Sequence, residues 1–134
     1  MPRKETCQVR VRYADTDQMG VVYHANYLRF FEVGRAEWLR AQGRSYREME
    51  DMGHLLPVIE THVRYRAPAR YDDLLDVAAT PDELRAASVR FVYEVRRAED
   101  GALLAEGWTR HACMRRDGRP VRWPAEIEAI LRGE

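Results

Sequence analysis

The sequence is poor in lysine, in cysteine and in long apolar runs. Its 134 residues contain one lysine, Lys4, and two cysteines. No apolar run approaches the ~20 residues that a membrane-spanning helix needs. The 22 basic and 22 acidic residues give a formal net charge of zero, so the composition offers no reason to expect binding to nucleic acid or to an anionic membrane. The other basic residues are arginines, a bias that genome composition or heat adaptation explains at least as well as phosphate binding.

The scarcity of cysteine argues against a disulfide framework. Cys7 and Cys113 both fall in strand-like segments, and two thiols without an apolar leader predict reduced, buried side chains. The first residues, MPRKETCQVRVRY, lack the apolar stretch of a signal peptide. We therefore expect a soluble cytoplasmic protein.

Internal repeats, low-complexity stretches and linkers are also missing. The length is sufficient for one domain with a substantial core and is short for two. With 46% hydrophobic and 33% charged residues, the composition is typical of globular proteins. We predict a single domain spanning residues 1–134.

Alternation of apolar and polar residues predicts a chain dominated by strands. Pro81 and Asp82 are expected to end one strand, and Asp100-Gly101 predicts a hairpin turn. Short helices are expected around residues 46–52 and after Pro124. The predicted strands lie at about residues 7–13, 57–66, 74–80, 89–96 and 103–115.

One long helix is predicted over residues 27–42, with Asn26 as its N-cap and Gly43 as its stop. It is apolar on most of its circumference, which indicates the central element of the core. Gly34 in this helix predicts the close approach of a strand or a partner helix. Gly107 predicts a bulge or close approach in the last strand.

The order of these elements predicts an α+β fold, in which an antiparallel sheet wraps around one long central helix. One strand precedes the helix, and about four strands follow it through tight hairpins. A single sheet with one helix leaves an edge or a face to be covered, which favours a homodimer.

Most residues suited to chemistry lie in residues 13–31, YADTDQMGVVYHANYLRFF. Asp15 and Asp17 would share a face on extended backbone, Gly20 permits a tight turn, and His24 directly precedes the predicted helix. A carboxylate, an imidazole and a helix N-terminus are the components of an acyl-transfer site. Each is also common in a structural role, the carboxylates as turn formers and the histidine as a hydrogen-bonded group. Spacing alone leaves the two interpretations in balance.

The motif of residues 13–27, followed by Glu32, resembles that of the 4-hydroxybenzoyl-CoA thioesterase family of hotdog-fold proteins. It is most similar to the branch that includes the Tol–Pal-associated acyl-CoA thioesterases. The segment PARYDDLL at 68–75 and the turn GRP at 118–120 also look like that family, so the match covers nearly the whole chain. The resemblance implies a hotdog fold and hydrolysis of an acyl-CoA thioester without a cofactor.

The same resemblance implies roles for two residues. Asp17 would attack the thioester or activate water, since an aspartate with an ordinary pKa of about 3.9 is ionised at neutral pH. The backbone N–H of His24 would hold the thioester oxygen. Histidine at this position, in place of the tyrosine of the hydroxybenzoyl enzyme, favours the acyl-CoA branch and leaves the role of its side chain open. We assign Asp15 to the structure of the loop.

Substrate contacts are also implied by the resemblance. Tyr23 and Asn26 adjoin the catalytic positions, and the site of this family lies between the subunits of a homodimer or homotetramer. His62 is therefore expected to reach a partner's site.

For the CoA phosphates, Arg85 matches the start of a basic run that binds the nucleotide in the hydroxybenzoyl enzyme. Alanines replace the rest of that run here. Arg64, Arg66 and Arg70 are the alternatives.

Three other functions were considered. Hotdog hydratases of enoyl thioesters pair an aspartate and a histidine at a closer spacing than Asp17 and His24. A non-catalytic acyl-CoA-binding protein would not need the intact Asp17. A metal site formed by Asp15, Asp17 and His24 lacks a fourth ligand. The acyl group, and the choice between CoA and acyl-carrier-protein thioesters, stay open.

Overall fold

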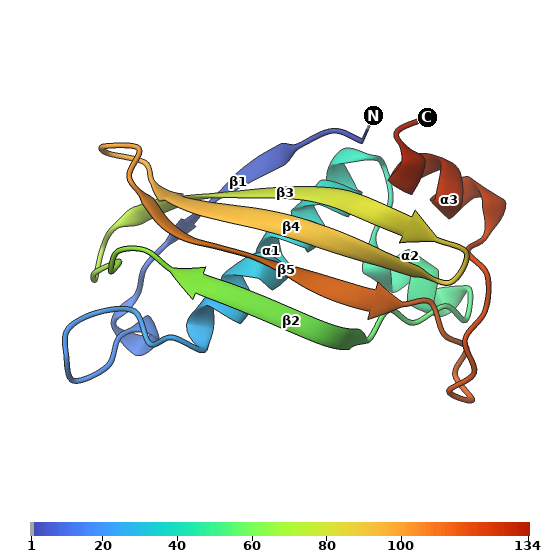
Figure 1. Cartoon of the computed structure of the whole chain (residues 1–134), viewed down its shortest axis with the longest axis horizontal. Helices are drawn as coiled ribbons and strands as arrows, with labels where there is room; N and C mark the ends of the chain where they lie inside the picture. The colour runs from blue at the N-terminus through green and yellow to red at the C-terminus, as the bar shows by residue number, and fades with distance from the viewer. Residues whose placement is uncertain (1) are drawn as a thin grey trace.

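The computed structural model describes residues 2–134 as one sheet with helices against it (Figure 1). All strands belong to a single five-stranded antiparallel sheet of order β1-β3-β4-β5-β2. The predicted α+β architecture is confirmed. In chain order the elements are β1 (Glu5–Arg10), the 3₁₀ turn η1 (Tyr13–Asp15), α1 (Asn26–Ala41), α2 (Tyr46–Asp51), β2 (Val58–Tyr65), β3 (Leu74–Arg85), β4 (Ser88–Arg97), β5 (Leu103–Ala112) and α3 (Ala125–Arg132).

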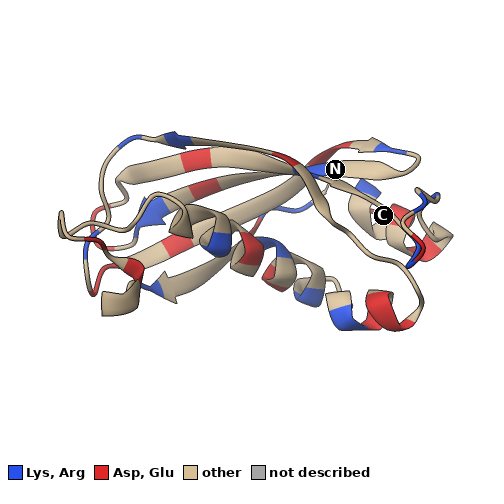
Figure 2. Ribbon diagram, turned by 90° about the horizontal axis from the view of Figure 1, so that it is seen from below, with Lys and Arg blue, Asp and Glu red and all other residues tan. Residues whose placement is uncertain are grey.

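The core lies between α1 and the concave inner face of the sheet. Alternation along β3 and β4 turns every second side chain towards α1, and each such side chain contributes about 1.5–3 kcal/mol on burial. The opposite side of α1 carries charged residues (Figure 2) and exposes Val33, so the helix is buried along one broad face. The buried residues include Phe31 and Trp38 of α1, Leu75 and Val77 of β3, and Phe91, Tyr93 and Val95 of β4.

Two glycines permit the close packing that their positions predicted. A Cβ atom at Gly34 would lie 2.9 Å from Cγ1 of Val77, so α1 sits directly on β3. A Cβ atom at Gly107 would overlap the backbone oxygen of His62 in β2 and lie 3.1 Å from the Phe31 ring. Glycine at 107 therefore lets β2, β5 and α1 meet at one point.

Some predicted strand ends are wrong. β3 continues through Pro81 to Arg85, although a break was expected at Pro81. The last β1 partner of β3 is Ala79, so Pro81 lies where β3 has no neighbour on that side, which is where a strand accommodates a residue without an N–H. β1 ends at Arg10 instead of residue 13, and β5 ends at Ala112 instead of residue 115.

The predictions for the cysteines are confirmed in part. Cys7 and Cys113 are free thiols, but only Cys113 is buried, whereas Cys7 is half-buried. Burial raises the pKa of Cys113 to about 11. α3 follows Pro124 and buries Ile127 and Leu131. Among the described residues, no helix is both long and apolar enough to cross a membrane.

The one lysine lies at the start of the sheet. Lys4 is exposed directly ahead of β1. Its neighbour Arg3 accepts a hydrogen bond from Nε1 of Trp38 at 2.7 Å, and Trp38 belongs to the last turns of α1. Lys4 is therefore placed away from the segment that precedes α1.

Candidate active site

The segment between η1 and α1 forms a tight loop that projects past the end of the sheet (Figure 1). Thr16 and Val22 form an isolated antiparallel bridge. Inside it, the N–H of Asp17 donates to the oxygen of Val21 at 3.0 Å, and the N–H of Gly20 donates to the oxygen of Asp17 at 2.9 Å. Gly20 has φ of +77°, a conformation that glycine adopts without strain. The loop is thus a small hairpin with Asp17 at its base.

The carboxylate of Asp17 is held at one oxygen only. Its Oδ1 accepts a hydrogen bond from the N–H of Met19 at 2.9 Å. Its Oδ2 accepts no hydrogen bond from any residue between 2 and 134, and the side chain is half-buried. Asp17 is therefore oriented by its own loop and keeps one oxygen available.

Asp15 is a structural anchor, as the sequence predicted. It is 1% exposed, and its carboxylate pairs with Arg12 at 3.1 Å and with Arg29 of α1 at 3.2 Å. Burial by itself would raise the pKa of Asp15, but the hydrogen bonds and charge of Arg12 and the hydrogen bond from Arg29 outweigh it and lower that pKa. The anion therefore fastens the loop to α1 and is not free to act as a metal ligand.

The prediction of Asn26 as N-cap is wrong. Asn26 is the first helical residue, and the residue before it, Ala25, already has helical φ and ψ of −67° and −22°. The Asn26 side chain donates instead to the backbone oxygen of Asp15 at 2.8 Å. The N–H of Tyr23 donates to the same oxygen at 2.9 Å. The Asn26 side chain therefore holds the backbone of the loop and does not cap the helix.

The start of α1 leaves two backbone donors free. The N–H groups of Asn26, Tyr27 and Leu28 donate to the oxygens three residues before them. The N–H groups of His24 and Ala25 donate to no acceptor within residues 2–134. They lie at the positive end of the helix dipole, where negative charge is stabilised. This arrangement suits an oxyanion.

A groove of about 290 Å³ adjoins these donors. The Tyr65 hydroxyl, from the end of β2, donates to the backbone oxygen of His24 at 3.0 Å, and its ring meets that of Tyr27 edge-on at 5.4 Å. The His24 side chain is exposed and lies against the Tyr23 ring at 4.5 Å. Asp17 does not line the groove within this single chain. The groove is mostly apolar and is lined by Val21, Val22, His24, Tyr27, Tyr65, Arg66, Ala67 and Pro68.

Arg70 lies beside this loop. It is exposed in the connection between β2 and β3. The residues on either side of it contact the loop, since Ala69 accepts a hydrogen bond from Val22 at 2.8 Å and Tyr71 stacks on Tyr13 at 3.9 Å. The structure thus groups Arg70 with Tyr23, His24, Asn26 and the Asp17 loop.

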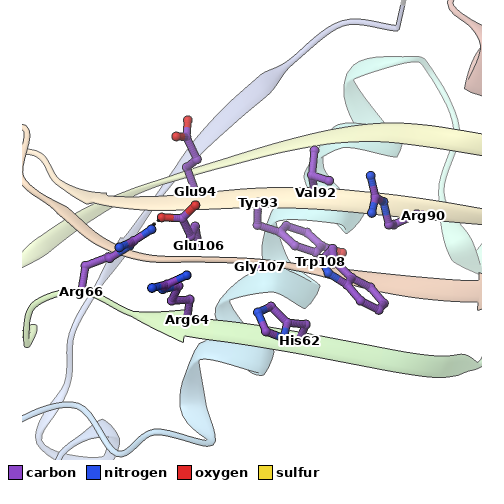
Figure 3. Close-up of a pocket in the computed structure, with 10 residues that line it drawn as sticks. All are labelled: His62, Arg64, Arg66, Arg90, Val92, Tyr93, Glu94, Glu106, Gly107 and Trp108. Atoms are coloured by element: carbon purple, nitrogen blue, oxygen red, sulfur yellow. Dashed lines mark hydrogen bonds and ion pairs between the residues drawn. The ribbon is translucent and has the colours of Figure 1, made fainter.

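Two other predicted site residues lie elsewhere in the chain. His62 pairs with Trp108 in the β2–β5 register and projects from the face of the sheet opposite to α1 (Figure 3). Arg85 ends β3, whose other end lies next to the loop. Because β3 has 12 residues, Arg85 is roughly 35 Å away along the strand.

Sequence reasoning missed Tyr65 and an interior polar network. Tyr65 ends an edge strand and occupies the inner face opposite Ala105, and the alternation of residues 59–65 was the signal that could have indicated its side of the strand. His111 and Thr109 of β5 are buried on the same face. Burial and the nearby charge of Arg35 lower the pKa of His111 to about 4. His111 is therefore neutral at pH 7 and is part of the buried core.

Comparison with known proteins gives consistent matches over nearly the full length. A sequence profile of the Thioesterase-like superfamily matches residues 11–131. The acyl-CoA thioesterase YbgC of Haemophilus influenzae is 37% identical over 125 residues, covering 92% of this chain and 90% of that protein. A hypothetical protein from Thermus thermophilus has a crystal structure with a TM-score of 0.90 and 39% identity, over 95% of this chain and 96% of that one. Slr0204, a 1,4-dihydroxy-2-naphthoyl-CoA thioesterase from Synechocystis, gives a TM-score of 0.91 at 27% identity, over 98% and 97% of the two chains.

Proposed function

The chain belongs to the thioesterase-like superfamily of hotdog-fold proteins and is an acyl-CoA thioesterase, and on this premise we propose that Asp17 and the start of α1 form its catalytic site. The predicted hotdog fold and the resemblance to acyl-CoA thioesterases are confirmed. The proposal concerns the residues and the mechanism. The observation that supports it most is that Asp17, with one carboxylate oxygen unbonded, lies in the loop that directly precedes the unpaired N–H groups of His24 and Ala25.

The proposed reaction begins with the thioester carbonyl oxygen at the N–H groups of His24 and Ala25. The carboxylate of Asp17 then attacks the carbonyl carbon, or removes a proton from a water molecule that attacks it. Negative charge develops on the carbonyl oxygen, and one preorganised donor there is worth about 3 kcal/mol. The C–S bond breaks and CoA leaves as a thiolate that takes up a proton. If Asp17 is the nucleophile, water hydrolyses the resulting anhydride and restores the carboxylate.

The groove beside His24 is proposed to hold the substrate next to its thioester. Its walls are largely apolar and include the aromatic rings of Tyr27 and Tyr65. The exposed His24 imidazole lines the groove and lies against the Tyr23 ring. Related proteins act on acyl-CoA in one case and on 1,4-dihydroxy-2-naphthoyl-CoA in another, so the acyl group must be determined by a substrate panel.

A second copy of the chain is proposed to complete the site. Within residues 2–134, β2 pairs only with β5, so its other edge is open. Three of its large side chains, Val58, Ile59 and Tyr65, are 46%, 52% and 49% exposed. Edge strands of this kind pair with another chain. Because Tyr65 contacts His24, a β2–β2 dimer would bring the partner to the groove. His62 and Arg85, distant from His24 within one chain, could contact a thioester at His24 only across such a shared site. Light scattering would test this homodimer, and a monomer at micromolar concentration would exclude it.

The catalytic role of Asp17 is tested by its replacement with asparagine. Purified protein is assayed for thiol release with short, medium, long and aromatic acyl-CoAs. Asp17→Asn is expected to lower kcat by about 10²–10⁴-fold and to leave the melting temperature unchanged. Asp51→Asn, at the exposed end of α2, removes the same charge away from the loop and should retain full activity.

Two outcomes would contradict this assignment. Unchanged turnover in Asp17→Asn would remove Asp17 from its role. Loss of enoyl absorbance without thiol release, on enoyl-CoA substrates, would show hydration in place of hydrolysis.

A further inference from the structure

A second groove, of about 370 Å³, lies on the outer face of the sheet, opposite to α1 (Figure 3). Side chains of β2, β4 and β5 form it. Its aromatic part consists of His62 and Trp108, whose rings stack at 6.1 Å with an angle of 19°. Its charged part consists of three arginines and two carboxylates, Arg64, Arg66, Arg90, Glu94 and Glu106. The catalytic proposal does not use this surface.

The arginines of this groove differ in their partners. Arg66 donates from Nε to Glu106 at 2.8 Å. Arg90 donates two hydrogen bonds to Asp82, at 2.8 and 2.7 Å. Arg64 makes no hydrogen bond or ion pair with any of residues 2–134, although Figure 3 shows it between Arg66 and His62. The groove therefore contains one uncompensated guanidinium beside an aromatic pair.

Arg66 connects this outer groove to the groove at His24. It is the residue that lines both of them, because it directly follows the last residue of β2. Along that strand Tyr65 faces α1 and Arg64 faces outward, as the alternation of a strand requires. A flexible ligand that starts beside Tyr65 can therefore turn around the end of β2 and reach Arg64.

We propose that the outer groove binds the phosphate end of the CoA substrate, with Arg64 as the residue that contacts a phosphate. This inference rests on the proposed function, in which the thioester lies at His24. A guanidinium presents paired N–H donors that match phosphate oxygens. The exposed His62 ring offers a flat surface to the adenine next to it, since bases stack on aromatic side chains. The Trp108 ring behind it already has the guanidinium of Arg90 at 5.8 Å from its centroid. CoA has both groups at the end opposite to its sulfur.

The test compares substrates that differ only at the end remote from the thioester. They are an acyl-CoA, its 3′-dephospho form, and the same acyl group on N-acetylcysteamine, which has neither phosphate nor adenine. The variants are Arg64→Ala, Arg64→Lys and Arg119→Ala. Arg119 is an exposed arginine in the turn after β5, at the other end of the sheet, so its replacement changes the net charge equally.

Arg64→Ala is expected to raise KM for the acyl-CoA about fivefold, the upper range for an exposed ion pair, with kcat unchanged. Its kcat/KM for the N-acetylcysteamine thioester should equal that of the parent. Arg64→Lys should recover part of the loss, and Arg119→Ala should show none. At high salt the difference between Arg64→Ala and the parent should shrink, since screening weakens exposed charge pairs.

Equal KM values for Arg64→Ala and the parent on acyl-CoA would overturn the inference. A loss of the same size on the N-acetylcysteamine thioester would also overturn it, because that substrate has no phosphate to lose. An effect from Arg85→Ala in place of Arg64→Ala would assign the phosphates to the opposite end of the sheet. In all three outcomes hydrolysis of the truncated thioester still reports on Asp17, so the catalytic proposal is judged separately.

Discussion

Replacing His111 with glutamine is expected to remove much of the acid sensitivity of the fold between pH 7 and pH 5. His111 is completely buried. Its Nε2 lies 2.8 Å from Oγ1 of Thr109, which lies 2.6 Å from the hydroxyl of Tyr93. Its Nδ1 lies 3.3 Å from the backbone oxygen of Leu56. In the described part of the chain, no carboxylate hydrogen-bonds to the ring to stabilise its charged form.

The magnitude follows from the two pKa values. Burial, reinforced by the charge of Arg35, lowers the pKa of His111 from 6.5 to about 4 in the folded protein. Below pH 6.5 the unfolded chain therefore binds a proton that the folded chain does not. The contribution to the free energy of unfolding is complete above pH 6.5 and is lost as the pH falls towards 4. The full difference corresponds to about 3 kcal/mol, and about 2 kcal/mol of it disappears between pH 7 and pH 5.

Urea unfolding, followed by tryptophan fluorescence at one protein concentration, measures this effect at pH 7, 6 and 5. His111→Gln should be less stable than the parent at pH 7, because glutamine fills the site imperfectly. Its loss of stability from pH 7 to pH 5 should be smaller than the parent's by about 2 kcal/mol. His62→Gln, at an exposed histidine, should keep the parent's pH dependence. An identical pH dependence in His111→Gln and the parent would refute the reasoning.

Three further substitutions probe packing and the loop. Gly107→Ala should destabilise the protein by at least about 3 kcal/mol in thermal or urea unfolding, since its methyl group would overlap the backbone of β2. Gly34→Ala should cost less because its one tight contact, at 2.9 Å, is with a side-chain methyl group of Val77 and not with backbone, and equal losses would contradict this account. Asp15→Asn should lower the free energy of unfolding by about 1–2 kcal/mol and also reduce kcat, because Asp15 fastens the catalytic loop to α1. Unaltered kcat in a measurably less stable Asp15→Asn protein would show that this anchor does not position Asp17.

The secondary structure and close packing could be predicted from the sequence where one physical signal dominated. Alternation along β4 predicted its inward side chains, because one face of that strand is fully covered. Gly34 and Gly107 predicted close approach, because few other causes place glycine inside such segments. The strand end predicted at Pro81 was wrong. A proline ends a strand only where a neighbouring strand needs its N–H group, and the tertiary structure determines whether such a neighbour is present.

The candidate site was predictable only in its local part. The motif placed Asp17 and His24 in a loop before a helix, since these residues are close in sequence. The side chain of Asn26 could accept a hydrogen bond from the N–H groups of its own helix start or donate one to the backbone oxygen of Asp15, and sequence does not rank the two. Alternation along β2 separated Tyr65 from Arg64 on opposite faces. It did not show that Tyr65 would contact His24, because that contact joins segments distant in sequence.

The isolated position of Lys4 has a practical consequence for handling the enzyme. Reagents that acylate side-chain amines find one target, at the start of β1 and beside the last turns of α1. A bead or sensor chip activated for such amines would hold every molecule by that end. The loop with Asp17 would then point into the flow, so immobilised enzyme should turn over substrate as readily as free enzyme.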